Sequence, residues 1–187
     1  MNSNIINRHA FSYCIALVPP EPSLGKLKQL QTDLASLYKI PCNQNFQPCI
    51  LLIEPFIWDN KKEYLLTDAL KKFAHNHFSV EIEVNGFSNN EKAVQLNILE
   101  KPVLNEIQKQ LKFHLDMHLK LIYGPSEPEI YHPYLDLAFS KKSKLGTRKL
   151  VQKLQDFEFN VHFIANNFSL FRYETDHYKQ IADFYLE

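Results

Sequence analysis

Few glycines and few cysteines are the first features of this sequence. Only 4 of its 187 residues are glycine, so it has no glycine-rich loop of the Walker or dinucleotide-binding kind to hold a phosphate. The 3 cysteines, Cys14, Cys42 and Cys49, form an odd set without a CxxC pair. This pattern excludes a disulfide-stapled scaffold and predicts a protein of a reducing compartment, the cytoplasm.

Net charge and long hydrophobic runs are absent as well. The chain has 21 Lys and Arg against 21 Asp and Glu, so its overall charge gives no attraction to nucleic acid or to an anionic membrane. No apolar run approaches the roughly 20 residues that cross a bilayer, and the N-terminal stretch lacks the pattern of a secretory signal. We therefore expect no membrane role.

What the chain does contain is ample material for a packed core. Hydrophobic residues make up 45% of it and aromatic residues 13%, with 14 Phe and 9 Tyr, which excludes a disordered chain. Residues 1–10 show no periodicity and are expected to be a loose tail. Residues 11–187 have a length typical of a single domain.

Apolar periodicity predicts an alternation of strands and helices. Strands are expected at 11–18, 48–55 between its two prolines, 78–87, 93–99, 134–139 and twice within 157–173. Helices are expected from Ser23 until Pro41 ends the segment, at 61–75, from Pro102 to near Gly124, and at 144–154. Residues 178–186 fit either a strand or a short helix. Because 78–87 and 93–99 read as a hairpin, the fold class is α+β with mainly antiparallel sheet.

The order of these elements, together with four stretches, resembles a known family. The stretches are YCIALVPPEPSLGKLKQLQ, NFQPCILLIEPF, LLTDALKKFAHNHFSVEIEVNGFSNNEKAVQLNI and EIYHPYLDLAFSKK. They are similar to the 2H phosphoesterases, which include the bacterial 2'-5' RNA ligase-like proteins. The resemblance implies one domain of two pseudo-symmetric lobes, built of mainly antiparallel sheet with outer helices around a central cleft.

Members of that family carry one His-x-Thr/Ser-x tetrad in each lobe, and this sequence departs from both. The corresponding residues are Cys49-Ile50-Leu51-Leu52 and Tyr134-Leu135-Asp136-Leu137. The family's imidazoles act as general acid and general base, whereas Cys titrates near about 8.5 and Tyr near about 10. Losing both groups lowers the reaction rate by a factor of roughly 10⁴–10⁸. The resemblance therefore implies a cleft lined by Cys49, Leu51, Tyr134 and Asp136 that binds without the usual chemistry.

His132 offers a way to keep some chemistry. It lies two residues before Tyr134, so a strand extended that far would turn His132, Tyr134 and Asp136 toward the cleft. His132 and Tyr134 are then the candidate catalytic residues, although His132 and Asp136 would be about 13 Å apart along the strand. A local hydrogen bond at the strand entrance is the alternative for His132. Cys49 is a weaker candidate as a nucleophile, because its apolar neighbours raise the pKa of the thiol.

The other histidines do not predict a cofactor or a metal. His75 and His77 form one pair, and His114 and His118 form another that is one helical turn apart. Neither pair has a third ligand at metal-binding spacing. A solvated helix face is the simpler account of His114 and His118.

One stretch of the chain is strongly basic despite the neutral total. Between Ala138 and Gln155 there is no acidic residue, and the basic residues are Lys141, Lys142, Lys144, Arg148, Lys149 and Lys153. This basic patch follows the second tetrad, so it is a candidate for weak contact with RNA at a rim of the cleft. The alternative is a solvated helix whose lysines balance the acidic hairpin around Glu81 and Glu83.

Three hypotheses about function follow. The leading one is a catalytically degenerate cytoplasmic protein that binds a small molecule, a nucleotide or RNA in its cleft. Because Asp136 brings a negative charge there, a neutral or cationic ligand fits better than a phosphate. The second is an active phosphoesterase or cyclic phosphodiesterase with rewired groups, namely His132, Tyr134 and Asp136. The third is a structural or interaction protein whose cleft is filled by its own side chains.

Overall fold

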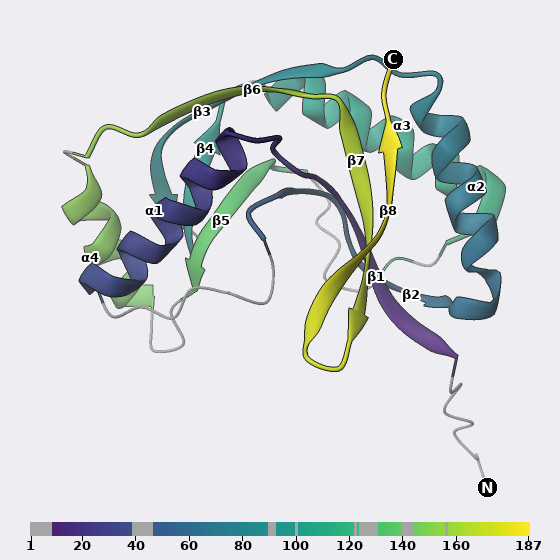
Figure 1. Ribbon diagram of the computed structural model, residues 1–187, viewed down its shortest axis with the longest axis horizontal. Coiled ribbons are helices and arrows are strands. Elements are labelled where there is room, and N and C mark those ends of the chain that lie inside the picture. Colours follow the sequence, from purple (N-terminus) through teal and green to yellow (C-terminus); the bar gives the residue numbers. More distant parts are fainter. Residues whose placement is uncertain are drawn as a thin grey trace, which may run out of the picture.

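The computed structural model describes residues 9–38, 47–89, 93–99, 101–121, 123, 131–139, 144–155 and 157–187. Within these residues, eight strands form one antiparallel sheet in the order β6-β3-β4-β5-β2-β1-β7-β8. The strands are β1 (Ala10–Leu17), β2 (Ile50–Asp59), β3 (Val80–Asn89), β4 (Ala93–Ile98), β5 (Tyr134–Phe139), β6 (Asn160–Ala165), β7 (Asn167–Glu174) and β8 (His177–Tyr185). The helices are α1 (Ser23–Tyr38), α2 (Glu63–Ala74), α3 (Lys101–Leu119) and α4 (Lys144–Leu154), with a short 3-10 turn, η1 (Asn60–Lys62), before α2. Figure 1 shows the sheet curling between two groups of helices.

The predicted fold class, α+β with mainly antiparallel sheet, is confirmed. The predicted hairpin is formed by β3 and β4, and the stretch 157–173 contains β6 and β7 as expected. The segment 178–186, which fitted two structures, is strand β8. Residues 1–8 of the predicted tail lie outside the described residues, while β1 already begins at Ala10.

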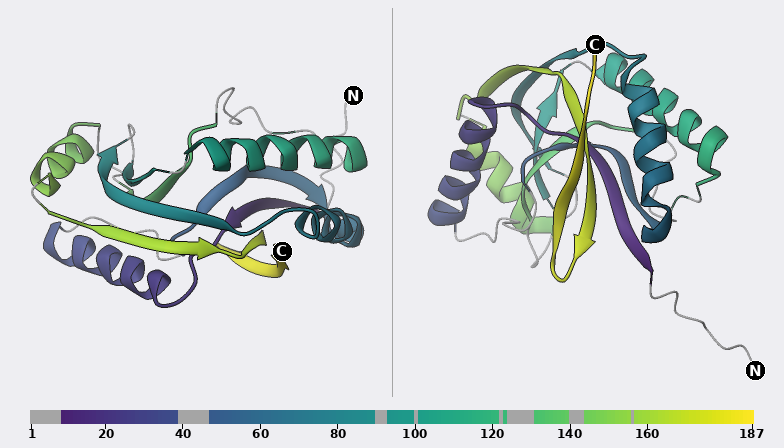
Figure 2. Two further views of the ribbon diagram at one scale, coloured as in Figure 1. Left: turned by 90° about the horizontal axis from the view of Figure 1, so that it is seen from above. Right: turned by 45° about the vertical axis from the view of Figure 1, so that its right-hand side comes forward.

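The sheet has two halves that meet at one pair of strands. One half is β6-β3-β4-β5 and the other is β2-β1-β7-β8, and they join where Ile50 of β2 lies opposite Leu135 of β5. Helices α1 and α4 pack on the first half, whereas α2 and α3 pack on the second. Figure 2 shows the same grouping, with one helix pair at each end of the molecule. The structure is therefore one curled sheet of two four-stranded halves, each covered by its own pair of helices.

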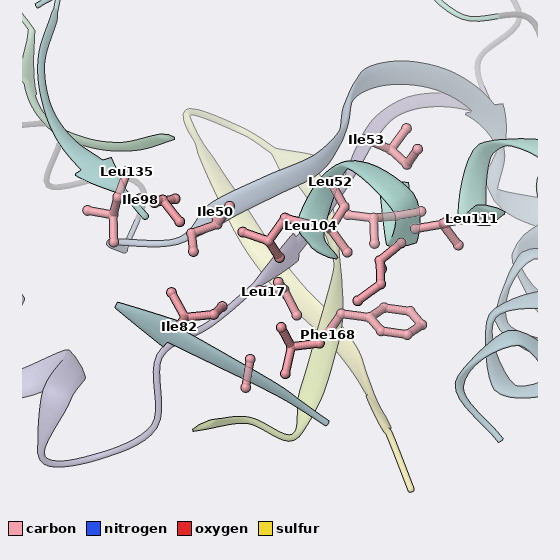
Figure 3. Close-up of a cluster of buried hydrophobic side chains, with 14 of the residues drawn as sticks. Leu17, Ile50, Leu52, Ile53, Ile82, Ile98, Leu104, Leu111, Leu135 and Phe168 are labelled. Atoms are coloured by element: carbon pink, nitrogen blue, oxygen red, sulfur yellow. The ribbon is translucent and has the colours of Figure 1, made fainter. Parts of the chain in front are cut away.

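The main hydrophobic core lies between the sheet and the helices. Both residues of the joining pair, Ile50 and Leu135, are fully buried in it (0% exposed). Figure 3 shows part of this core, where Leu104 and Leu111 of α3 lie close to Leu52 of β2. Burying each such side chain stabilises the fold by about 1.5–3 kcal/mol. We call the opposite side of the sheet, away from this core, the second face.

Strand β2 does not end at Pro55, contrary to the boundary expected from the sequence. It continues to Asp59, because the strand has bulges where it pairs with β1. Between the pairs Tyr13–Phe56 and Ile15–Ile53, two residues of β2, Glu54 and Pro55, oppose one residue of β1. A bulge of this kind tolerates proline, since the extra residue leaves the hydrogen-bond ladder.

Candidate functional site

The four residues predicted to line the cleft, Cys49, Leu51, Tyr134 and Asp136, lie together on the second face, where the two halves of the sheet join. Because Ile50 pairs with Leu135 in antiparallel register, Cys49 lies beside Asp136 and Leu51 lies beside Tyr134. Side chains of successive strand residues point to opposite faces, and Ile50 and Leu135 point into the core. Their neighbours on both strands therefore share the second face.

Two of these residues are held by hydrogen bonds to polar neighbours. The amide of Gln95, on β4, donates from Nε2 to Oδ1 of Asp136 at 2.9 Å. The hydroxyl of Tyr134 donates to Oε1 of Glu54, on β2, at 3.3 Å. Leu51, Glu54, Tyr134 and Asp136 all keep partial exposure to solvent, whereas Cys49 is only 7% exposed. The site thus presents two carboxylates and a phenol at its surface.

Burial raises the pKa of each titratable residue among these four, namely Cys49, Tyr134 and Asp136. Burial raises the pKa of Asp136 from 3.8 to about 6, against the opposing effect of the Gln95 hydrogen bond. Burial, followed by the charges of Glu54 and Asp136, raises the pKa of Tyr134 above its usual range. Burial also raises the pKa of Cys49 far above its usual range. Among these three groups, Asp136 therefore titrates nearest to neutral pH.

Glu54 belongs to this site, although the sequence analysis did not single it out. Its negative charge raises the pKa of four groups on the second face, so it lies among them: Cys14, Cys49, Tyr134 and Tyr178. It also raises the pKa of Tyr131, which packs against the main core. The one signal in the sequence is a lone carboxylate inside the apolar run ILLIEPF. The sequence does not show on which face of the sheet Glu54 lies, because the bulge in β2 decides that.

Beside the carboxylates lies a small apolar cluster, which we call the apolar floor. It consists of Cys14, Ala16, Cys49 and Phe171, each at most 7% exposed, with Val18, Leu51 and Tyr178 packed against it. It is a separate cluster from the main core. The side chains of the apolar floor therefore bury one another from solvent, while the polar residues around them stay partly exposed.

The thiols of Cys14 and Cys49 are expected to be unreactive in the folded protein. Burial raises the pKa of both, and the thiolate is the reactive form. In a Cys42→Ser variant, we expect Ellman's reagent at about pH 8 to label no thiol before unfolding and both after it. Labelling of the folded variant as fast as that of the guanidinium-unfolded variant would show instead that Cys49 is an available nucleophile.

His132 is placed differently from its neighbours. Strand β5 begins at Tyr134, so the extension that would turn His132 toward the cleft is not formed. His132 is exposed to solvent. Tyr131 contributes to the site instead, since its hydroxyl donates to the carbonyl oxygen of Leu51 at 2.7 Å.

The other histidines have structural partners of their own. Nδ1 of His77 lies 2.7 Å from the Phe73 carbonyl oxygen, and its ring stacks on Phe73. Nε2 of His114 lies 2.9 Å from the Ala69 carbonyl oxygen, and Nδ1 of His118 lies 2.8 Å from the His114 carbonyl oxygen. Among the described residues, no three His, Cys, Asp or Glu side chains gather as metal ligands.

The described residues of the basic patch lie on a helix and not on the second face. Arg148, Lys149 and Lys153 are exposed on α4, which packs on β3 and β4. Lys141 and Lys142 lie outside the described residues, and so does the side chain of Lys144. The acidic strand expected to balance these charges has other partners. Glu81 accepts from Nε2 of His162 at 2.6 Å, and Glu83 accepts from Asn160 at 3.4 Å.

Comparisons with known proteins agree on the fold. A Thermus thermophilus protein has a TM-score of 0.69 at 14% identity, over 94% of this chain and 97% of that one. Escherichia coli LigT in complex with ATP has a TM-score of 0.64 at 9% identity, over 95% of this chain and 98% of LigT. LigT in complex with 3'-AMP has a TM-score of 0.65 at 10% identity, with the same shares covered. At these identities the likeness establishes the fold alone.

The family comparison is more specific. No curated protein matches the sequence. Among the helices of the described residues, none is long and apolar enough to span a membrane. The family described as the 2'-5' RNA ligase superfamily matches residues 19–177. Because this match covers most of the chain, the protein belongs to the 2'-5' RNA ligase superfamily.

Proposed function

We propose that this protein is a cytoplasmic ligand-binding member of its superfamily that lacks the phosphodiester chemistry of the two-histidine site. One observation carries the proposal. On the two adjacent strands that the resemblance aligns with the family's tetrads, the side chains are a buried thiol, a leucine, a phenol of raised pKa and a carboxyl group, Cys49, Leu51, Tyr134 and Asp136. Together they do not supply the pair of proton carriers that acid-base cleavage requires near neutral pH, because only Asp136 titrates in that range.

The accessible residues of the second face are the proposed binding surface. Leu51, Tyr134 and Asp136 are partly exposed beside Glu54, so a small molecule can reach them. Crystal structures of LigT with ATP, 3'-AMP and NADP+ support small molecules and nucleotides as the ligands of this fold. The partial exposure argues against a purely structural protein whose cleft is fully closed.

A rewired enzyme is the second candidate, and one observation favours it. The pKa of Asp136 is raised to about 6, which suits a general acid or base near neutral pH. Its proton-transfer partner would have to be Tyr134 or Glu54, since β5 does not extend to His132. Such an enzyme would show a pH-rate profile with an inflection near the pKa of Asp136.

The test is turnover of the superfamily's kind of substrate. We expect no opening of 2',3'-cyclic AMP and no cleavage of a 2'-5'-linked diadenylate by the natural protein, followed by chromatography of the products. Native mass spectrometry of protein purified from its own cytosol should show a retained small molecule. Turnover that Tyr134→Phe or Asp136→Asn abolishes would overthrow the proposal and favour the rewired enzyme.

A matched gain-of-function variant controls for the position of the site. Cys49→His, Leu51→Thr, Tyr134→His and Asp136→Thr in one chain restore both tetrads. This variant should bind inorganic phosphate, whereas the natural protein should not, as measured by calorimetry. A variant that is folded by circular dichroism but gains no phosphate binding would show that these residues do not occupy the tetrad positions.

A further inference from the structure

A buried amide lies beside the carboxyl group of Asp136. Gln95 is only 7% exposed although its side chain is polar, and it lies on β4 directly opposite Asp136 of β5. Cross-strand partners share a face, so Gln95 belongs to the second face as Asp136 does. Buried polar groups need a hydrogen-bond partner, and here the partner is the carboxyl group itself, with Oδ1 at 2.9 Å from Nε2 of Gln95.

A bulge between β4 and β5 brings these two side chains together. Val94 pairs with Ala138, whereas the next residue, Gln95, pairs with Asp136, so Leu137 of β5 is the extra residue. Regular pairing would place Gln95 opposite Leu137, which is fully buried in the main core. The contact between the amide and the carboxyl group therefore depends on the bulge, a feature that re-aims side chains beside many functional sites.

The hydrogen bond suits the ionised form of Asp136. An ionised carboxyl group has only acceptors, whereas a protonated one also has an O–H donor. Gln95 turns its NH2 group toward Asp136 and donates from Nε2 to Oδ1. The amide thus supplies the donor that an ionised carboxyl group needs, and a hydrogen bond to a charged acceptor is stronger than one between neutral groups.

The other neighbours of Asp136 on this face offer it no positive charge. They are Cys49 and Glu54 on β2 and Tyr134 on β5 itself. Burial raises the pKa of Cys49 and of Tyr134, so both are neutral at pH 7, and Glu54 adds a negative charge. Helix α1 packs against β5 from the opposite side, where the core lies. Among these neighbours, Gln95 is therefore the group that stabilises the ionised carboxyl group.

We propose that Gln95 is a positioning residue of the second face, which holds Oδ1 of Asp136 toward β4 and keeps Asp136 ionised at neutral pH. The proposal rests on the proposed function, because it states how the charge of the same binding site is set. Burial raises the pKa of Asp136 to about 6, and the hydrogen bond from Gln95 acts in the opposite direction. Without the amide, burial alone would leave much of Asp136 protonated at neutral pH. Gln95 thus decides which charge a ligand meets at this position.

The titration of the Asp136 carboxyl group tests the proposal. Carbon-13 NMR of protein labelled at the aspartate carboxyl carbons follows it, and the spectrum of Asp136→Asn identifies the signal. We expect a midpoint at about pH 6 in the natural protein. In Gln95→Met, which keeps the length of the side chain but has no donor, the midpoint should rise to about pH 7–8. An unchanged midpoint in folded Gln95→Met would overturn the proposal.

A matched control removes a different amide from the same strand and the same face. Asn97 lies two residues after Gln95 and pairs with Tyr134, so Asn97→Ala leaves the contact between Gln95 and Asp136 in place. The Asp136 midpoint should stay at about pH 6 in this variant. A rise as large as that in Gln95→Met would show a general effect of changes in β4, and Gln95 would lose its assigned role.

A measurement on the natural protein covers the case in which Gln95→Met does not fold. The side-chain amide protons of Gln95, observed by nitrogen-15 NMR, should shift with the same midpoint as the carboxyl carbon of Asp136, because the amide donates to that group. The amide protons of Asn97 should not follow this midpoint. A Gln95 signal that stays constant while Asp136 titrates would also refute the role of Gln95.

These titrations need neither a ligand nor a reaction, so their outcome is separate from that of the proposed function. Turnover of a 2',3'-cyclic nucleotide would overturn the proposed function, while the midpoints would still decide the role of Gln95. In that case, the inflection of the pH-rate profile should move with the carboxyl midpoint in Gln95→Met. A midpoint that does not respond to Gln95→Met would overturn the role of Gln95 and leave the proposed ligand binding untouched.

Discussion

The Asp136→Asn variant is expected to be more stable than the natural protein by about 3 kcal/mol at pH 7, because it removes an ionised group that is largely shielded from solvent. Burial raises the pKa of Asp136 from 3.8 to about 6, so ionising it in the folded state costs more than in the unfolded state. Asparagine keeps the carbonyl oxygen that accepts from Gln95. The variant therefore loses the charge and retains the hydrogen bond.

The sign of the effect fixes its pH dependence. Between about pH 4 and pH 6, the native state binds more protons at Asp136 than the unfolded state does. The free energy of unfolding of the natural protein therefore falls as pH rises through this window. Asparagine does not titrate, so the advantage of the variant should be absent near about pH 4 and complete by about pH 7.

Urea unfolding at several pH values between these limits measures the prediction. Glu83→Gln is the matched control for the loss of one negative charge from the second face. A stability gain of Asp136→Asn that is the same at low and at neutral pH would contradict the pKa assignment. A gain that grows across the window would show that the protein retains an ionised, partly buried Asp136 at a cost in stability, which is typical of a group kept for binding.

Apolar periodicity alone was sufficient to predict the strands that have one apolar face and one polar face. In β3, Val80, Ile82 and Val84 enter the core while Glu81 and Glu83 do not, so the strand and its hairpin follow from the alternation. The final strand, β8, is an edge strand with few fully buried residues. Its pattern is weak because only pairing with β7 makes it a strand, and the sequence therefore left its structure open.

The site was predictable only in part, for a related reason. Cys49, Leu51, Tyr134 and Asp136 share a face because of regular alternation about Ile50 and Leu135. The resemblance to the family was needed to expect that these two strands are neighbours. Glu54 reaches the same face through a bulge that depends on how β2 meets β1. No local pattern in β2 contains that information.

The strand that was expected to include His132 begins two residues later. The expectation that it faces the cleft required β5 to extend through Pro133, which cannot donate to the ladder. Strand β5 instead begins at Tyr134, and the pairing with β4 also starts there, opposite Asn97. A proline next to a strand of six residues was thus a better guide than the spacing of His132, Tyr134 and Asp136.

The second large effect is expected for Leu135→Ala, which should lower the free energy of unfolding by about 2–5 kcal/mol. Leu135 is fully buried and pairs with Ile50 at the one described register position that joins the two halves of the sheet. Alanine leaves a cavity there, and Leu135→Met, which nearly conserves volume, should cost less than about 1.5 kcal/mol.

The same variant tests whether the two lobes are one domain. Trp58 is the single tryptophan and lies on β2, so its fluorescence reports one half, while far-ultraviolet circular dichroism reports both. If the shared core makes the halves one cooperative unit, both signals shift together in Leu135→Ala, as a two-state transition requires. A fluorescence midpoint that stays in place while part of the dichroism signal is lost early would show two separately folding halves. Because the tetrad residues flank this joint on both strands, such separation would also disassemble the proposed site.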